Sequence, residues 1–234
     1  MKLILILAAI LAFAFGGTAE AAEQNLPTIS VSGEGVVEAA PDRATISLGI
    51  VNRDKNASKV QSDNARIAAD IIQAISSLGV ERRNIRTGNY SFHQVYRTDG
   101  SRRIQDGYEA NNTVTVIVED LSLVGKIIDA ALANGANNVD SLNFGIRNKT
   151  NLINDAIRLA VRDARAKAEV VASELGKKIV GVRSISVNSG SISAPRMNKM
   201  MMRDAVAAES YETPIESGTL SCNASVHVEF EMSR

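Results

Sequence analysis

The sequence predicts an α+β fold in which helices cover a largely antiparallel sheet. Stretches in which apolar and polar residues alternate, typical of half-buried strands, are separated by stretches with apolar residues every three or four positions, typical of amphipathic helices. These stretches follow one another in the order ββ-α-ββ-α-β-α-ββ. The chain of 234 residues is 45% hydrophobic and 22% charged, which is the composition of a globular protein with a sizeable core.

Two alternating stretches, residues 28–38 and 44–50, form the predicted first pair of strands. Pro41 and Asp42 stand between them and are typical turn residues. We therefore expect these two strands to form a hairpin with one buried face.

The first helix is expected between Asn56, whose side chain can cap a helix N-terminus, and Gly79, which favours helix termination. The pair Asp99-Gly100 is a strong hairpin signal and predicts a second pair of strands around it. The expected apolar stripe of the helix consists of Val60, Ile67, Ile71, Ala74 and Leu78. The expected apolar face of the return strand consists of Tyr108, Ala110, Val114, Val116 and Val118.

A second helix is expected between Asp120, another capping residue, and Gly135, followed by a fifth strand at residues 142–146. The longest helix is expected at about residues 150–175, with a stop at Gly176. Alanine recurs in it every four residues, which makes a narrow seam that lets another backbone approach closely. The seam consists of Ala156, Ala160, Ala164, Ala168 and Ala172.

The last two strands are expected at residues 179–187 and 220–232, and the second of them alternates along its whole length. Cys222, the single cysteine, falls on the apolar face of that strand. An intermolecular bridge or a reactive thiol would need an exposed position, so this placement favours an inert buried thiol.

The N-terminus has the pattern of a secretory signal peptide. Lys2 precedes an apolar run over residues 3–15, and Ala19-Glu20-Ala21 matches a cleavage site, so the mature chain would begin at Ala22. The run is too short for a membrane anchor, and we expect no transmembrane segment in the mature chain, residues 22–234. The expected location is the periplasm, with secretion or attachment to the outer membrane as the alternatives.

The periodicity fails over residues 191–217, which predicts a long methionine-rich loop. Met197, Met200, Met201 and Met202 lie within six residues. Thioether sulfurs are soft ligands that suit Cu(I), and they also take up oxidants reversibly as sulfoxides. The competing interpretation is an adaptable contact surface, because methionine fills irregular gaps.

Other candidate residues carry no recognisable reaction motif. His93 and His227 would have to converge in space to act as an acid–base pair. The segment Gly33-Glu34-Gly35 begins like a phosphate loop, but position 38 is glutamate and a strand follows. Its glycines instead indicate a bulge or close packing in the first strand. We therefore expect no catalytic residue and no cofactor. An enzyme with an unrecognised site is the least favoured interpretation.

Two sets of residues around the second hairpin suggest surface contacts. Tyr90, Phe92 and Tyr96 favour packing in the core or between subunits, because the zero net charge argues against nucleic acid as a stacking partner. An arginine cluster indicates either a charged edge that prevents unwanted strand pairing or a contact with an anionic envelope component. The cluster consists of Arg82, Arg83, Arg86, Arg97, Arg102 and Arg103.

A series of short motifs then runs through the chain in a characteristic order and spacing. Among them are Val31-Ser32-Gly33-Glu34-Gly35, Gly107 to Val116 (GYEANNTVTV), Gly135-Ala136-Asn137 and Thr213-Pro214-Ile215. With them, the chain from about Thr28 to Glu231 resembles the SIMPL-domain family, which includes bacterial periplasmic immunogenic proteins. The resemblance implies an exported envelope protein, often an oligomer, with links to stress tolerance. It implies no catalytic residues.

The leading hypothesis is therefore a non-enzymatic periplasmic protein that forms homo-oligomers and supports envelope or oxidative-stress tolerance. The alternative is a module that binds Cu(I) or scavenges oxidants through the methionine-rich loop.

Overall fold

The computed structural model describes residues 26–188, 190, 192–193 and 215–234. Its strands form two separate antiparallel sheets, and each sheet carries helices on one face. The order of elements agrees with the predicted α+β order, with one additional two-residue strand.

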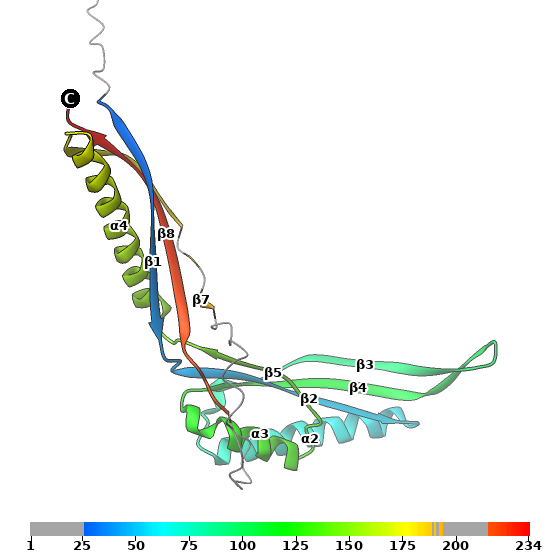
Figure 1. The fold of residues 1–234 in the computed structure, drawn as a ribbon. Coiled ribbons are helices and arrows are strands. Elements are labelled where there is room, and N and C mark those ends of the chain that lie inside the picture. The colour runs from blue at the N-terminus through cyan, green and yellow to red at the C-terminus, as the bar shows by residue number, and fades with distance from the viewer. Residues whose placement is uncertain (1–25, 189, 191, 194–214) are drawn as a thin grey trace, which may run out of the picture.

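The first sheet, here called sheet A, has the strand order β1-β8-β6, with the short strand β7 also paired to β8. The long helix α4 covers one of its faces (Figure 1). Its elements are β1 (Thr28–Ala39), α4 (Lys149–Glu174), β6 (Ile179–Asn188), β7 (Ile192–Ser193) and β8 (Leu220–Met232).

The second sheet, sheet B, has the strand order β3-β4-β2-β5 and is covered on one face by α2 and α3. This arm holds the larger core, built from β2, β4 and the two helices. Its strands are β2 (Arg43–Asp54), β3 (Ile85–Asp99), β4 (Arg102–Val118) and β5 (Asn138–Gly145). Its helices are α2 (Ala57–Ser77) and α3 (Val124–Ala133), with 3-10 turns at Arg82–Asn84 and Leu121–Leu123.

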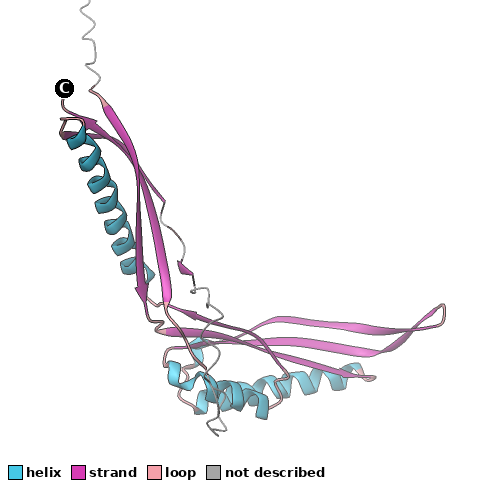
Figure 2. Cartoon of the chain, viewed as in Figure 1, coloured by secondary structure: helices cyan, strands magenta, loops and turns pink. Residues whose placement is uncertain are grey.

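The two sheets form the arms of an L (Figure 1). Figure 2 shows the helices on the outer side of both arms, so that the helix-free faces of both sheets line the inner angle. Asp42 ties the arms together where they meet. Its N–H donates to the Gly145 carbonyl oxygen at 3.1 Å, and its carboxylate accepts from the Arg147 N–H at 2.6 Å.

The expected first hairpin is wrong. β1 pairs with β8 along its whole length, whereas β2 pairs with β4 and β5 in the other sheet. The alternation in both strands does mark a buried face, as predicted, but the two faces pack on different helices. Pro41 and Asp42 therefore form the corner between the arms and do not close a hairpin.

The alanine seam of α4 packs directly against β1. All five of its predicted alanines are buried. Opposite them lie Gly33 and Gly35, and a Cβ on either one would collide with the α4 backbone, at 2.5 Å from the Ala164 nitrogen and 2.6 Å from the Ala160 nitrogen respectively. The close backbone approach predicted for α4 and the close packing predicted for Gly33 and Gly35 thus occur in the same contact.

The helices begin and end close to the predicted positions. Asn56 and Asp120 accept hydrogen bonds from the backbone N–H groups of the turns that follow them, and Asn148 does the same for α4. The buried stripe of α2 differs from the prediction, because Ile67 and Leu78 are only partly buried against the core. The stripe that is buried consists of Val60, Asn64, Ala68, Ile71 and Ile75.

The predicted second hairpin is confirmed and is longer than its sheet. β3 and β4 pair from Ile85↔Val116 to Asp99↔Arg102, but the pairing of β2 with β4 ends at Asp54↔Tyr108. Beyond that point β3 and β4 continue as a two-stranded ribbon, residues 95–107 (Figure 1). Gly107 sits at the boundary with φ +127, where a Cβ would lie 2.7 Å from the Asp54 carbonyl oxygen.

Candidate interaction surfaces

The helix-free face of sheet A is polar over most of its area. Most of the side chains that alternate with the buried ones on β1, β8 and β6 are hydroxyls, carboxamides and carboxylates, and Val36 is an apolar exception. Arg183 reaches across this face to Glu231, at 3.3 Å, and to Glu229, at 4.0 Å. His227 lies on the same face, where its Nδ1 is 3.2 Å from Ser32 Oγ.

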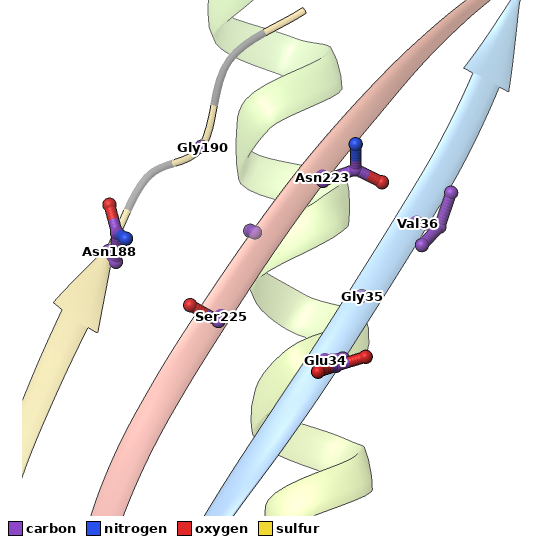
Figure 3. A pocket seen from close by; sticks show the side chains of 8 residues that line it. Glu34, Gly35, Val36, Asn188, Gly190, Asn223 and Ser225 are labelled. Carbon is purple, nitrogen blue, oxygen red and sulfur yellow. The ribbon is translucent and has the colours of Figure 1, made fainter. Parts of the chain in front are cut away.

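An open groove of about 330 Å³ crosses this face where β6 ends. Figure 3 shows that its side chains come from three neighbouring strands: Glu34 from β1, Asn223 and Ser225 from β8, and Asn188 from β6. One carboxylate, two carboxamides and one hydroxyl can form hydrogen bonds with a polar ligand. Within this group, Glu34 and Ser225 are direct cross-strand partners.

Sheet B carries a buried carboxylate on its helix-free face, which the sequence reasoning missed. Glu109 is only 7% exposed and accepts hydrogen bonds from Asn111 Nδ2, at 3.0 Å, and from Arg53 Nε. His93 Nε2 lies 3.5 Å away. The hydrogen bond from Asn111, followed by the contact with Arg53, holds the pKa of Glu109 below its ordinary value, against the opposing effect of burial.

The two histidines do not converge. His93 belongs to β3 in sheet B and His227 to β8 in sheet A, so each interacts with a different strand neighbour. The structure therefore does not assemble the acid–base pair that the sequence left open. A signal for the Glu109 cluster was present in the sequence, because Arg53 and Glu109 are oppositely charged, but only the β2–β4 register places them side by side.

Cys222 is fully buried, as predicted. It lies between Ala156 of α4 and apolar residues of the adjoining strands. Burial raises the pKa of its thiol, which disfavours the reactive thiolate.

The arginine cluster is divided into two groups. Arg82, Arg83 and Arg86 lie at the base of β3, whereas Arg97, Arg102 and Arg103 lie at the end of the ribbon. β3 is an edge strand of sheet B, so the predicted charged edge agrees with the topology. Arg97 lies 3.7 Å from Asp106, and the Arg103 guanidinium stacks over the Tyr96 ring at 4.2 Å.

The aromatic residues of β3 do not enter the core of their own chain. Tyr90, Phe92 and Tyr96 are all exposed, with Phe92 stacked on Tyr108 at a ring separation of 5.7 Å. The core interpretation is therefore wrong within one chain. Backbone irregularities between Gly88 and Ser91 and after Val95 also break the simple alternation on which it relied.

The two edges of sheet A differ. On the β1 edge, Asp163 of α4 accepts a hydrogen bond from the Glu34 N–H at 2.8 Å, and Lys167 donates to the Ser32 carbonyl oxygen at 3.1 Å. Asp163 and Lys167 also form an i,i+4 ion pair at 2.7 Å. Lys167 and, to a lesser degree, the Glu34 N–H hold the pKa of Asp163 below its ordinary value.

The β6 edge presents exposed apolar side chains. α4 lies over β1 and β8, so the helix-side face of β6 is left open (Figure 1). Val182, Ile185 and Val187 on that face are 56%, 54% and 48% exposed. Apolar side chains this exposed on consecutive positions of one face are typical of a contact surface.

Several expectations fall on residues that the structure does not describe. Met197, Met200, Met201 and Met202 and the cleavage-site residues Ala21 and Ala22 lie outside the described ranges, as does most of the loop 191–217. The described ranges contain no group of three or more His, Cys, Asp or Glu side chains that could hold a metal ion. The helices of those same ranges include none long and apolar enough to cross a membrane.

Fold and surfaces together define a two-armed α+β protein with open polar sheet faces. The family described as "SIMPL: Protein of unknown function (DUF541)" matches residues 29–230, and the chain belongs to this family.

Two groups of relatives are similar over nearly the whole chain. A "26 kDa periplasmic immunogenic protein" of Brucella melitensis is 31% identical over 233 residues, which cover 94% of this chain and 92% of the relative. An "Uncharacterized protein YggE" of Escherichia coli strain K12 is 26% identical over 206 residues, 88% of this chain and 83% of the relative. The resemblance inferred from the sequence motifs is thereby confirmed.

Proposed function

We propose that this chain is an exported periplasmic protein that works as an assembly of several copies and has no catalytic role. The relative in Brucella melitensis is named a periplasmic protein, and the N-terminal sequence has the signal-peptide pattern. The observation that carries the assembly is the ribbon formed by residues 95–107, with its exposed Tyr96 and Ile104 side chains.

The ribbon lacks the support that stabilises the rest of sheet B. A two-stranded hairpin alone is only marginally stable in water and needs a third strand or a helix against one face. Within the ribbon, Tyr96 and Ile104 are nevertheless exposed. Contact with another copy would bury these side chains and would stabilise the part of the hairpin that extends past the end of β2.

The test replaces residues 96–106 with Asn-Gly, a two-residue turn that joins the paired residues Val95 and Gly107. We expect the shortened chain to fold but to contain fewer subunits per assembly than the wild type, as the ratio of native mass to subunit mass in light scattering shows. The control is Val170→Ser, which removes an even more exposed apolar side chain from α4. An unchanged number of subunits in the shortened chain would remove the ribbon as an assembly contact.

Export itself has a direct test. Cleavage after Ala21 leaves a mature chain beginning at Ala22, which intact-mass measurement of protein from a periplasmic extract would detect. Full-length protein in the cytoplasmic fraction would contradict this part of the proposal.

The supporting role in stress tolerance requires a test in cells. A strain without this protein should lose tolerance to peroxide or envelope stress, and the wild-type gene should restore that tolerance. If the gene for the shortened-ribbon chain restores tolerance equally well, the stress role does not depend on this contact.

The methionine-rich loop supports a second candidate function, binding of Cu(I) or capture of oxidants. Its basis is the density of thioethers at Met197, Met200, Met201 and Met202. Replacement of all four by leucine, which keeps their apolar character, should abolish Cu(I) binding and lower peroxide tolerance. Retention of both properties would exclude this function.

A further inference from the structure

We propose that two copies of this chain pair edge to edge through β6 in antiparallel orientation, around a two-fold axis at Ser186. This inference rests on the proposed self-assembly and adds the surface through which two copies meet. It joins sheet A of one copy and sheet A of the other into one continuous sheet, with an α4 helix from each copy on the same side.

The first step is that β6 is an edge strand, and no other strand of the described residues pairs with its outer side. The Glu34 N–H and the Ser32 carbonyl point away from β8, because they bond to α4. Backbone groups of an antiparallel strand alternate between its two neighbours. Because Ser32 and Glu34 point away from β8, their partners His227 and Ser225 point away from β1 and toward β6. The backbone of Ser186, the partner of His227, therefore points toward β8, and the backbones of Ile185 and Val187 point outward.

The second step is that the described part of the chain gives this edge none of the usual protection. Natural edge strands are blocked by charges, prolines or covering elements, since a bare edge is a template for another strand. β1 has such a cover in Asp163 and Lys167. The β6 segment from Ser184 to Asn188, in contrast, is Ser-Ile-Ser-Val-Asn, without charge or proline.

The third step is that the segment is complementary to itself in one register. Centred on Ser186, each Ile185 lies opposite Val187 of the other copy, so both outward apolar residues meet an apolar residue. Serine meets serine at the axis, and Ser184 meets Asn188. A register centred on Ile185 would instead place Val187 opposite Arg183, which leaves an apolar residue against a charge. Two-fold pairs of this kind form closed, isologous contacts.

The pairing would also cover the exposed strip on the helix side. Ile185 and Val187 are 54% and 48% exposed, and cross-strand apolar pairs are the units that stabilise a sheet. On the other face, the serines and asparagine of the segment continue the polar surface of sheet A. The contact thus buries apolar groups on one side without placing a charge against a like charge.

Cysteine cross-linking tests the register directly. In the proposed pair, the Cα atoms of the two Ser186 residues are about 4.5 Å apart, within the range for a disulfide, whereas the two Ser184 residues are offset by four positions, roughly 13 Å. We expect the mature Ser186→Cys chain to form a covalent dimer under mild oxidation and the matched Ser184→Cys chain to remain uncross-linked. The buried native Cys222 stays in both variants and in the wild-type control.

A second variant measures the contact without cross-linking. Ile185→Lys should halve the native mass of the assembly, while Val170→Lys, on the exposed side of α4, should leave it unchanged. Suppose that the wild type is multimeric. The β6 contact alone is then overturned if Ser186→Cys cross-links no better than Ser184→Cys, or if Ile185→Lys keeps the native mass of the wild type. A wild type with the mass of a single subunit overturns the proposed assembly as well.

Discussion

At the residue scale, two glycines determine how closely α4 approaches sheet A. The alanine seam removes side-chain bulk from the helix, and Gly33 and Gly35 remove it from β1, so the two backbones meet without a layer of larger side chains between them. A core this thin has little room to adjust to added volume.

The glycine contact leads to a stability prediction. Gly35→Ala should lower the free energy of unfolding by about 1–3 kcal/mol, the usual cost of overpacking a tight site, because the added methyl would meet the α4 backbone. The matched control is Gly88→Ala in β3, where a Cβ has open space, and its effect should stay within about 0.5 kcal/mol. Urea unfolding of the three proteins gives the comparison, and equal stabilities would contradict the close-packing account.

Glu109 leads to a prediction about pH. Its pKa is lower in the folded chain than its ordinary value of 4.5, so its ionised form contributes stability above that pH. The contribution disappears as pH falls through the lower folded pKa. The wild type should therefore be more stable than Glu109→Gln at pH 7, and the difference should shrink as the pH is lowered toward 3.

The control for this pH series is Glu174→Gln at the exposed C-terminal end of α4. Its difference from the wild type gives the effect of removing an exposed carboxylate over the same range. A pH-independent difference for Glu109→Gln would show that the carboxylate is not held ionised by Asn111 and Arg53.

At the scale of elements, helix bounds and caps were predictable because their signals are local. Asn56 and Asp120 cap in the structure as the sequence indicates. The pairing partners of the strands were not predictable, because alternation shows which face of a strand is buried but not which strand lies beside it. The first predicted hairpin failed for this reason, since β1 finds its partner β8 nearly two hundred residues away in the chain.

The edge contact between α4 and β1 leads to a prediction at this scale. Asp163→Ala should speed hydrogen exchange of the Glu34 amide, because its acceptor is lost, while the Gly33 amide, directed toward β8, should stay protected. Asp155→Ala is the matched control, since Asp155 pairs with Arg158 on the same helix. Equal exchange of the Glu34 amide in all three chains would show that Asp163 does not protect this edge.

At the scale of the whole molecule, each arm has helices on one side of its sheet only. The L leaves apolar side chains exposed on β3 and on the helix side of β6. The sequence predicted that helices cover one face of antiparallel strands. It could not predict two sheets or the exposed aromatic residues of β3, because these depend on where β2 ends and which strands α4 covers.

Surface residues were predictable where their environment depends on a single strand. Cys222 was placed correctly because burial follows from alternation within one strand. The Glu109 cluster and the protected β1 edge were missed because each joins residues from separate elements. The separation of His93 from His227 likewise became visible only when their strands were assigned to different sheets.

The measurement that tests the central claim most directly is the native mass of residues 22–234, by light scattering on a sizing column over a wide range of protein concentrations. The account predicts a discrete, even multiple of the subunit mass, since the β6 contact joins copies in pairs. A mass equal to one subunit at every concentration would contradict it.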